Sequence, residues 1–170
     1  MADKNIAVES GYEFDFSGVK LDYYDDPENR VQGLHSVDFI IENETHILFI
    51  EVKNPDCPES TEERKKEFFE SIRNHGLIAE IGRKFKDSLL RKYAEGYIFE
   101  KPVKYIFILQ FDRYYAKQRN NFRKSLINDH IPAKKLNSEE FKAFCKFESF
   151  EMPNIKQFCE KYKFPVRAII

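Results

Sequence analysis

The first half of the chain contains two apolar runs separated by a short polar segment. Residues 36–41 and 47–52 are apolar at positions that would face both sides of a strand, which is typical of strands covered on two faces. The polar residues 42–45 between them predict a hairpin turn. Pro55 ends the second strand, because proline cannot donate to a sheet ladder.

Further strands are predicted on both sides of this hairpin. Apolar and polar residues alternate at 12–16 and again at 19–23, with a break at Gly18, which indicates two short half-buried strands. Later in the chain, residues 103–111 form another β-rich run, and residues 147–150 predict a short strand.

A helical pattern extends over residues 60–94. Ser60 or Thr61 would be its N-cap, and Gly76 would divide it into two helices. In the second helix an apolar side chain recurs every four residues, which predicts a stripe that lies on the sheet. The members of this stripe are Leu77, Ile81, Phe85, Leu89 and Tyr93.

The remaining segments are predicted from weaker patterns. Residues 113–128 form a basic helical stretch, closed by Pro132. Helices are expected at 138–145 and 153–162, and residues 166–170 are expected to be extended.

Length and composition limit the organisation of the protein. A chain of 170 residues with 42% hydrophobic residues is large enough for one well-filled core and too short for two ordinary domains. We therefore expect residues 1–170 to form a single domain. Its 28 Lys and Arg nearly balance 29 Asp and Glu, so nucleic-acid binding would need a local basic patch.

The cysteines and the apolar runs indicate the compartment. Cys57, Cys145 and Cys159 are odd in number and include no CxxC pair, which indicates neither a disulfide framework nor a thiolate zinc site. The first eleven residues lack the apolar core of a signal peptide, and no run approaches the ~20 residues of a membrane span. We expect a soluble, cytoplasmic protein without membrane contact.

Three charged residues lie within the apolar hairpin: Asp38, Glu51 and Lys53. Because side chains alternate along a strand, Glu51 and Lys53 share a face. If Glu42 pairs with Thr45 across a two-residue turn, Asp38 falls on that face too. As a diagonal neighbour of Glu51, its Cα would lie ~7–8 Å away, so both carboxylates can reach one cation.

This combination of side chains suits phosphodiester chemistry. Two carboxylates supply the hard oxygen ligands that Mg²⁺ prefers, and the ion can accept a substrate phosphate as well. Lys53 could stabilise charge on phosphorus, and could orient or deprotonate the attacking water if burial lowers its pKa. The sequence thus predicts a metal-dependent phosphodiesterase site.

The hairpin also resembles the signature of the PD-(D/E)XK nuclease superfamily. The resemblance rests on Asp38 at the start of one strand, the triplet Glu51-Val52-Lys53 near the end of the next, and a following helix and strand. It covers about residues 10–112. It implies a restriction-endonuclease-like, three-layer α/β fold: an αβββαβ core whose mixed sheet is flanked by helices, here with a C-terminal α/β extension.

The resemblance also implies roles for these residues. Asp38 and Glu51 would hold Mg²⁺ or Mn²⁺, the Val52 carbonyl would be a third ligand, and Lys53 would be the catalytic lysine. Many members add an acidic residue from a helix ahead of the sheet. Here that short region offers three acidic residues, of which we expect Glu13 to take the role; the others are Glu9 and Asp15.

Two other interpretations of the charged residues stay open. Asp38, Glu51 and Lys53 could form an exposed ion pair of little consequence, although the apolar runs around them make an idle buried cluster costly. The chain could also be a nuclease-fold module that binds DNA or a partner protein without cutting.

The basic stretch after the strand at 103–111 is a candidate nucleic-acid surface. Its Lys and Arg, with Tyr114 and Tyr115, could grip phosphates and stack on bases, and an ordinary solvated helix face explains it equally well. The basic residues are Arg113, Lys117, Arg119, Arg123 and Lys124.

Together these patterns predict a nuclease that hydrolyses a phosphodiester bond by in-line water attack. Nucleic acid is the expected partner, with DNA favoured over RNA. Because the net charge is -1, a homodimer or a partner protein could contribute to DNA binding.

Overall fold

The computed structural model describes most of the chain; the described residues are 5–23, 33–110, 124, 130, 138–142 and 144–169. Its main feature is a five-stranded mixed sheet with the strand order β3-β4-β5-β6-β7. The strands of this central sheet are β3 (Lys20–Tyr23), β4 (Phe39–Glu42), β5 (Ile47–Lys53), β6 (Val103–Leu109) and β7 (Phe147–Glu151).

Neighbouring strands of the central sheet pair in two ways. Strands β3, β4 and β5 form an antiparallel meander, whereas β5, β6 and β7 are parallel. A parallel pair needs a long crossover connection, and between β5 and β6 it contains the helices α1 (Glu62–Arg73) and α2 (Gly76–Ala94).

A smaller second sheet combines segments from distant parts of the chain. It consists of β1 (Ile6–Glu9), β2 (Tyr12–Asp15) and β8 (Val166–Ala168), in the order β1-β2-β8 with antiparallel pairing. Two further helices are α5 (Glu139–Lys142) and α6 (Ile155–Tyr162).

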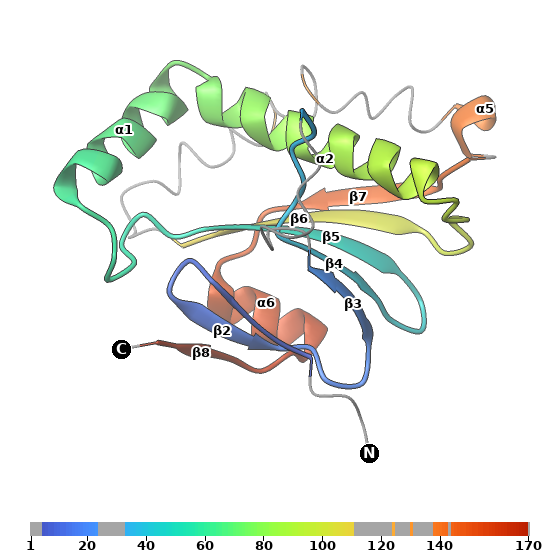
Figure 1. Ribbon diagram of the computed structural model, residues 1–170, viewed down its shortest axis with the longest axis horizontal. Coiled ribbons are helices and arrows are strands. Elements are labelled where there is room, and N and C mark those ends of the chain that lie inside the picture. Colours follow the sequence, from blue (N-terminus) through green and yellow to red (C-terminus); the bar gives the residue numbers. More distant parts are fainter. Residues whose placement is uncertain are drawn as a thin grey trace.

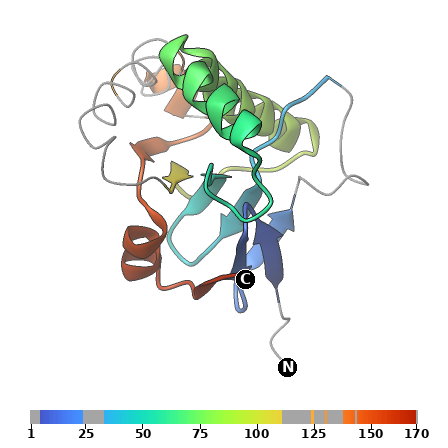
Figure 2. The same ribbon diagram turned by 90° about the vertical axis from the view of Figure 1, so that its left-hand side faces the viewer.

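The elements form layers around the central sheet. Helices α1 and α2 lie over one face, and α6 and the small sheet lie against the other (Figure 1). The view along the perpendicular direction shows the same arrangement (Figure 2). The α/β class and the mixed central sheet are confirmed. The second face of the central sheet is covered by the small sheet as well as by α6. Strand β7, which was expected to belong to a C-terminal extension, is instead an edge strand of the central sheet.

The alternation of side chains along β5 separates two hydrophobic cores. Ile47 and Phe49 pack in the core under α2, together with Phe85. Leu48 and Ile50 point the other way, into the core shared with the small sheet and α6. A strand buried on both faces is what its continuous apolar run predicts.

The helical prediction for residues 60–94 is confirmed in detail. The Thr61 hydroxyl accepts the backbone N–H of Arg64 at 3.2 Å as the N-cap of α1, and α2 begins at Gly76. The predicted stripe lies on the sheet, except for its last member. Tyr93 is 61% exposed and makes an edge-to-face contact with the Phe144 ring.

Other predicted elements differ in extent or lie outside the described residues. Segments 12–16 and 19–23 form strands that belong to different sheets, and β1 was not expected. The helix expected at 138–145 is limited to α5. The basic stretch 113–128 lies outside the described residues except for Lys124, which is exposed. In the described ranges no helix is long and apolar enough to cross a membrane.

Candidate active site

Asp38, Glu51 and Lys53 lie together on the face of the central sheet that α2 covers. Asp38 directly precedes β4, and extending the register by one residue beyond the pair of Phe39 with Ile50 sets it opposite Glu51. Asp38 is 3% exposed and Glu51 is 0% exposed. The shared face predicted from the alternation is therefore present, and both carboxylates are buried.

The turn that produces this alignment differs from the predicted one. Glu42 pairs with Ile47, not with Thr45, so the register is shifted by two residues. The Asn43 side chain organises the turn by accepting the backbone N–H groups of Thr45 and His46 at 2.9 and 2.8 Å. Because side chains alternate with a period of two, a shift of two leaves Asp38 on the expected face.

A backbone hydrogen bond fixes the Asp38 carboxylate. Its Oδ2 atom accepts the N–H of Val52 at 2.7 Å. The Val52 carbonyl, which the family resemblance implies as a metal ligand, accepts the Ser10 hydroxyl at 3.4 Å. The peptide groups around Val52 therefore connect Asp38, β5 and the β1–β2 turn.

Two lysines contact the Glu51 carboxylate. Lys53 Nζ lies 3.0 Å from Glu51 Oε1 and 3.6 Å from Glu80 Oε1. Lys84 Nζ donates to the same Glu51 Oε1 at 2.6 Å and lies 3.7 Å from Asp38 Oδ1. Strand β5 and helix α2 thus each contribute one ammonium group to a buried pair of acids.

One carboxylate oxygen of this cluster has no hydrogen-bond partner in the part of the chain that the structure describes. Glu51 Oε2 is buried and unpartnered among the described residues, whereas Oε1 of the same group has two lysines. Burying a carboxylate oxygen without a partner is costly. Such an oxygen beside the Asp38 carboxylate fits a hard divalent cation, which both groups could hold.

The donor set suits a cation that keeps other ligands. The described residues contain no group of three or more His, Cys, Asp or Glu side chains placed to hold a metal ion. An ion at Asp38 and Glu51 would therefore complete its coordination with water, backbone or substrate oxygens. Mg²⁺ is commonly bound in this way, through one or two carboxylates.

The electrostatics of the cluster favour the arrival of a cation. Burial, and then the nearby charge of Glu51, raise the pKa of Asp38 well above its ordinary value, although Lys84 and Lys53 act in the opposite direction. The two carboxylates thus repel each other in a site with little water.

The same surroundings favour the charged form of Lys53. Burial lowers its pKa, but the charges of Glu51, Asp38 and Glu80 outweigh burial, and the net result is a raised pKa. Lys53 is therefore positively charged at neutral pH in this arrangement. It is suited to stabilising negative charge, and the condition for its acting as a base, a lowered pKa, is not met.

Glu9 of the small sheet acts on the cluster electrostatically. Its charge contributes to the raised pKa of Asp38, and its Oε1 accepts the Ser10 hydroxyl at 2.9 Å. Glu13, the expected fourth acid, is not brought to the site. It pairs instead with Arg167 of β8 at 2.7 Å, on the outer face of the small sheet, because neighbouring Phe14 points into the core.

Sequence reasoning did not identify Glu80 and Lys84 as members of the cluster. Both precede a member of the apolar stripe by one residue, Ile81 and Phe85, and they are four residues apart on α2. Two charged residues four positions apart, each directly before a member of the stripe that faces the sheet, could have indicated that their side chains lie at the edge of the helix–sheet interface. The predicted nucleic-acid-binding residues, which lie outside the described part, are Arg113, Lys117, Arg119 and Arg123.

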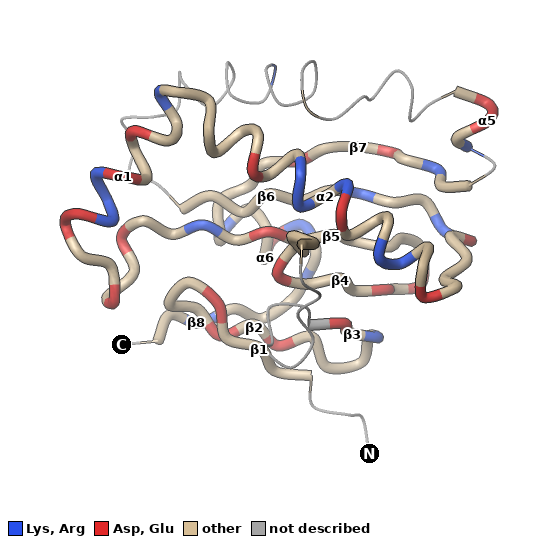
Figure 3. Tube along the Cα trace, turned by 45° about the horizontal axis from the view of Figure 1, so that its top comes forward, with Lys and Arg blue, Asp and Glu red and all other residues tan. Residues whose placement is uncertain are grey.

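The charges on the covering helices are mixed. Acidic and basic residues are interspersed along α1 and α2 (Figure 3). This distribution agrees with the near-zero net charge of the chain. It gives α1 and α2 no single sign of charge toward a polyanion.

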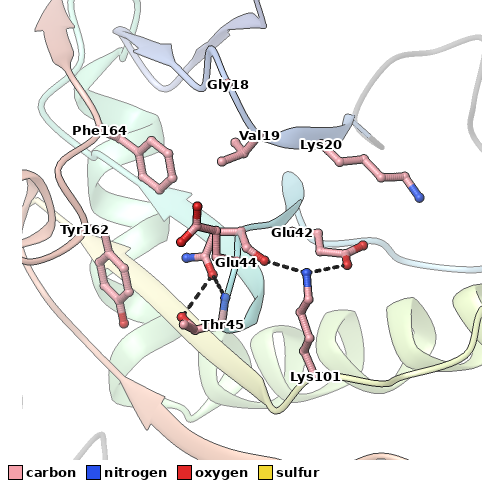
Figure 4. Close-up of a pocket in the computed structure, with 10 residues that line it drawn as sticks. Gly18, Val19, Lys20, Glu42, Glu44, Thr45, Lys101, Tyr162 and Phe164 are labelled. Carbon is pink, nitrogen blue, oxygen red and sulfur yellow. Dashed lines mark hydrogen bonds and ion pairs between the residues drawn. The ribbon is translucent and has the colours of Figure 1, made fainter.

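A separate hollow of about 680 Å³ lies at the opposite end of β5, beside the β4–β5 turn. Two of its charged groups pair with each other, since Lys101 contacts Glu42 at 2.8 Å, and Lys101 also donates to the Asn43 carbonyl at 2.7 Å (Figure 4). Tyr162 and Phe164 line its other side. The hollow is distant along β5 from the acidic pair, so we do not assign the phosphodiester chemistry to it.

No protein-family model matches this chain, and no curated protein or solved structure is significantly similar to it.

Proposed function

We propose that this protein is a metal-dependent nuclease that hydrolyses nucleic-acid phosphodiester bonds, with DNA favoured over RNA. The main support is the buried pair of Asp38 and Glu51, in which Glu51 Oε2 lacks a hydrogen-bond partner among the described residues, next to the charged Lys53. An idle surface ion pair would be neither buried nor left with an unpartnered carboxylate oxygen.

In this proposal Asp38 and Glu51 hold Mg²⁺ or Mn²⁺. When bound, the cation would act as a Lewis acid and neutralise charge on the phosphodiester. The Val52 N–H keeps the Asp38 carboxylate in place at 2.7 Å. Such support from a second layer of contacts reduces the reorganisation that binding requires.

Lys53 would stabilise the charge that develops on the phosphoryl oxygens. Hydrolysis forms a bond from a water oxygen to phosphorus and breaks the bond from phosphorus to the leaving oxygen. The water releases a proton to solvent, and the leaving oxygen takes one up. A positively charged side chain at the edge of a buried site contributes more to such a step than it would in water.

The exposure of the cluster indicates the side from which substrate would approach. Exposure of the side chain rises from 0% for Glu51 to 28% for Lys53 and 45% for Glu80. The edge formed by Lys53 and Glu80 is therefore open to solvent, while the Asp38 and Glu51 carboxylates lie deeper. A phosphate that enters at this edge would reach Lys53 before the buried Asp38 and Glu51 carboxylates.

The test is a cleavage assay with labelled single-stranded, duplex and branched DNA and with RNA, in Mg²⁺ or Mn²⁺ at several salt concentrations. We expect cleavage that EDTA abolishes and that Asp38→Asn and Lys53→Ala each reduce by ~10²-fold or more. Lys86→Ala, an exposed lysine on α2, is the matched control and should cleave normally.

Two results would count against the proposal in different ways. If every substrate stays intact in both metals, the chain is not a nuclease by itself, and substrates bound but uncut would indicate the binding module instead. If cleavage survives both Asp38→Asn and Lys53→Ala, the activity does not belong to this site.

A further inference from the structure

Lys84 makes contacts that distinguish it from Lys53. Its Nζ lies 2.6 Å from Glu51 Oε1 and 3.7 Å from Asp38 Oδ1, so one ammonium group bridges the two acids. Lys53 ion-pairs with Glu51 and with Glu80 instead. Lys84 thus bridges the two side chains that would hold the metal ion.

The position of Lys84 is set by the packing of α2. Its neighbours Ile81 and Phe85 are buried against the sheet, and the Tyr105 hydroxyl donates to the Ile81 carbonyl at 2.9 Å. The backbone that carries Lys84 is therefore held over the acids. Its four-carbon side chain can still rotate away, because a lysine stem has several free torsions.

We propose that Lys84 is an internal counter-cation, which offsets part of the charge of Asp38 and Glu51 before metal binds and withdraws when a divalent cation takes its place. This inference rests on the proposed function. Without a positive charge, two adjacent buried carboxylates would repel each other strongly. The contacts of Lys84 with both carboxylates reduce this repulsion in the metal-free protein.

The same contact must weaken metal binding. A divalent cation held by Glu51 Oε2 and the Asp38 carboxylate would lie close to Lys84 Nζ, which contacts Glu51 Oε1 and Asp38 Oδ1, and positive charges at such distances repel. Part of the binding free energy of the ion is therefore spent in displacing Lys84. Lys84 would set the metal concentration at which the site fills.

Calorimetric titration with Mn²⁺ tests this idea on the wild type, Lys84→Met and Lys86→Met. We expect Lys84→Met to bind Mn²⁺ about tenfold or more tightly than the wild type, a typical size for coupling between two sites. Lys86→Met removes one positive charge from an exposed position on the same helix and should bind as the wild type does. Equal or weaker binding by folded Lys84→Met would overturn the inference.

A measurement on the wild type keeps the test independent of how Lys84→Met folds. A brief pulse of acetic anhydride, followed by peptide mass spectrometry, reports how accessible each lysine amine is. We expect saturating Mn²⁺ to increase acetylation of Lys84 severalfold and to leave Lys86 unchanged. Unchanged or reduced labelling of Lys84, with Mn²⁺ shown to be bound, would refute a withdrawal.

The two proposals can fail separately. If calorimetry detects no Mn²⁺ binding by the wild type or by either variant, the metal site itself is refuted, and the inference about Lys84 falls with it. If the wild type binds Mn²⁺ and Lys84→Met binds it no better, only the role of Lys84 is refuted.

Discussion

The Asp38 carboxylate accepts the backbone N–H of Val52, the residue between Glu51 and Lys53, at 2.7 Å. One hydrogen bond therefore sets the position of Asp38 relative to both of its charged neighbours on β5. It also makes Asp38 a structural acceptor as well as a candidate metal ligand, and the two roles can be separated by substitution.

Asparagine at position 38 should stabilise the protein, although it should abolish metal binding. Its amide oxygen can still accept the Val52 N–H, and it removes a charge whose pKa is raised by burial and by Glu51. A carboxyl whose pKa is raised in the folded state contributes stability that is fully present below its unfolded pKa and is lost as the pH rises through the folded pKa. Urea unfolding at pH 7 in EDTA should give Asp38→Asn a higher free energy of unfolding than the wild type.

Alanine at the same position is the matched comparison. Asp38→Ala removes the acceptor and leaves the Val52 N–H buried without a partner, which costs about 1–3 kcal/mol. We therefore expect Asp38→Ala to be less stable than Asp38→Asn by about that amount. Equal stability of the two variants would mean that the hydrogen bond contributes nothing to the fold.

Substitution of Gly11 should loosen the β1–β2 turn next to the site. Its φ is +80°, and an added Cβ would lie 3.1 Å from the Cys57 Cβ and 3.2 Å from the Pro58 Cδ. Gly18 has a φ of +86° with nothing within 4 Å of such a Cβ. Gly18→Ala should cost only the left-handed backbone penalty, about 1–2 kcal/mol.

Gly11→Ala should cost more than Gly18→Ala, because the turn must also move away from Cys57. Urea unfolding of both variants measures the difference. The shift should also carry Ser10 away from the Val52 carbonyl and so lower the affinity for Mn²⁺, which calorimetry can follow. Equal costs for the two alanines would show that the close contact with Cys57 is easily relieved.

Tyr105→Phe should weaken the attachment of α2 to the sheet. The buried Tyr105 hydroxyl donates to the Ile81 carbonyl at 2.9 Å, one turn before Lys84 on α2. Losing this bond should lower the free energy of unfolding by about 1 kcal/mol. Tyr93→Phe, at a position 61% exposed, is the control and should change it by less than about 0.5 kcal/mol.

Stability should fall in acid partly through Glu42. Hydrogen bonds from Lys101, and then from Tyr97, lower the pKa of Glu42 from its ordinary value of 4.5. A lowered carboxyl pKa gives stability that is present above the unfolded pKa and is lost as the pH falls through the folded pKa. The difference in unfolding free energy between the wild type and Glu42→Gln should therefore shrink below about pH 4.5.

Tyr97→Phe offers a direct check of the cause. Removing the hydroxyl that donates to Glu42 Oε2 at 2.7 Å should raise the pKa of Glu42 toward its ordinary value. Titration of the Glu42 side chain by NMR would show this, and an unchanged pKa would leave Lys101 and Lys20 as the causes.

The relation between Asp38 and Glu51 could be predicted because it depends on alternation alone. The predicted pairing of Glu42 was wrong by two residues, yet any even error preserves the face on which a side chain lies. The four-residue repeat from Leu77 to Leu89 likewise placed α2 on the sheet, because the helical period is a local property.

The contributions of Lys84 and Glu9 depend on tertiary packing and were not predictable in the same way. The angle and height at which α2 crosses the sheet decide which of its charged residues meets Glu51. The position of Glu9 depends on the small sheet, in which β2 near the beginning of the sequence pairs with β8 near its end. Local patterns contain little information about such distant pairings.

The small sheet also has a consequence for how the protein folds. Its β2–β8 pairing joins Phe14 to Val166 and Tyr12 to Ala168. Because loop closure over so long a segment is slow, and β8 leaves the ribosome after the strands of the central sheet, this pairing should be among the last to form. The acidic pair would then be assembled before the strand that stabilises its neighbouring turn, and a nascent chain would acquire its complete site only once synthesis has passed β8.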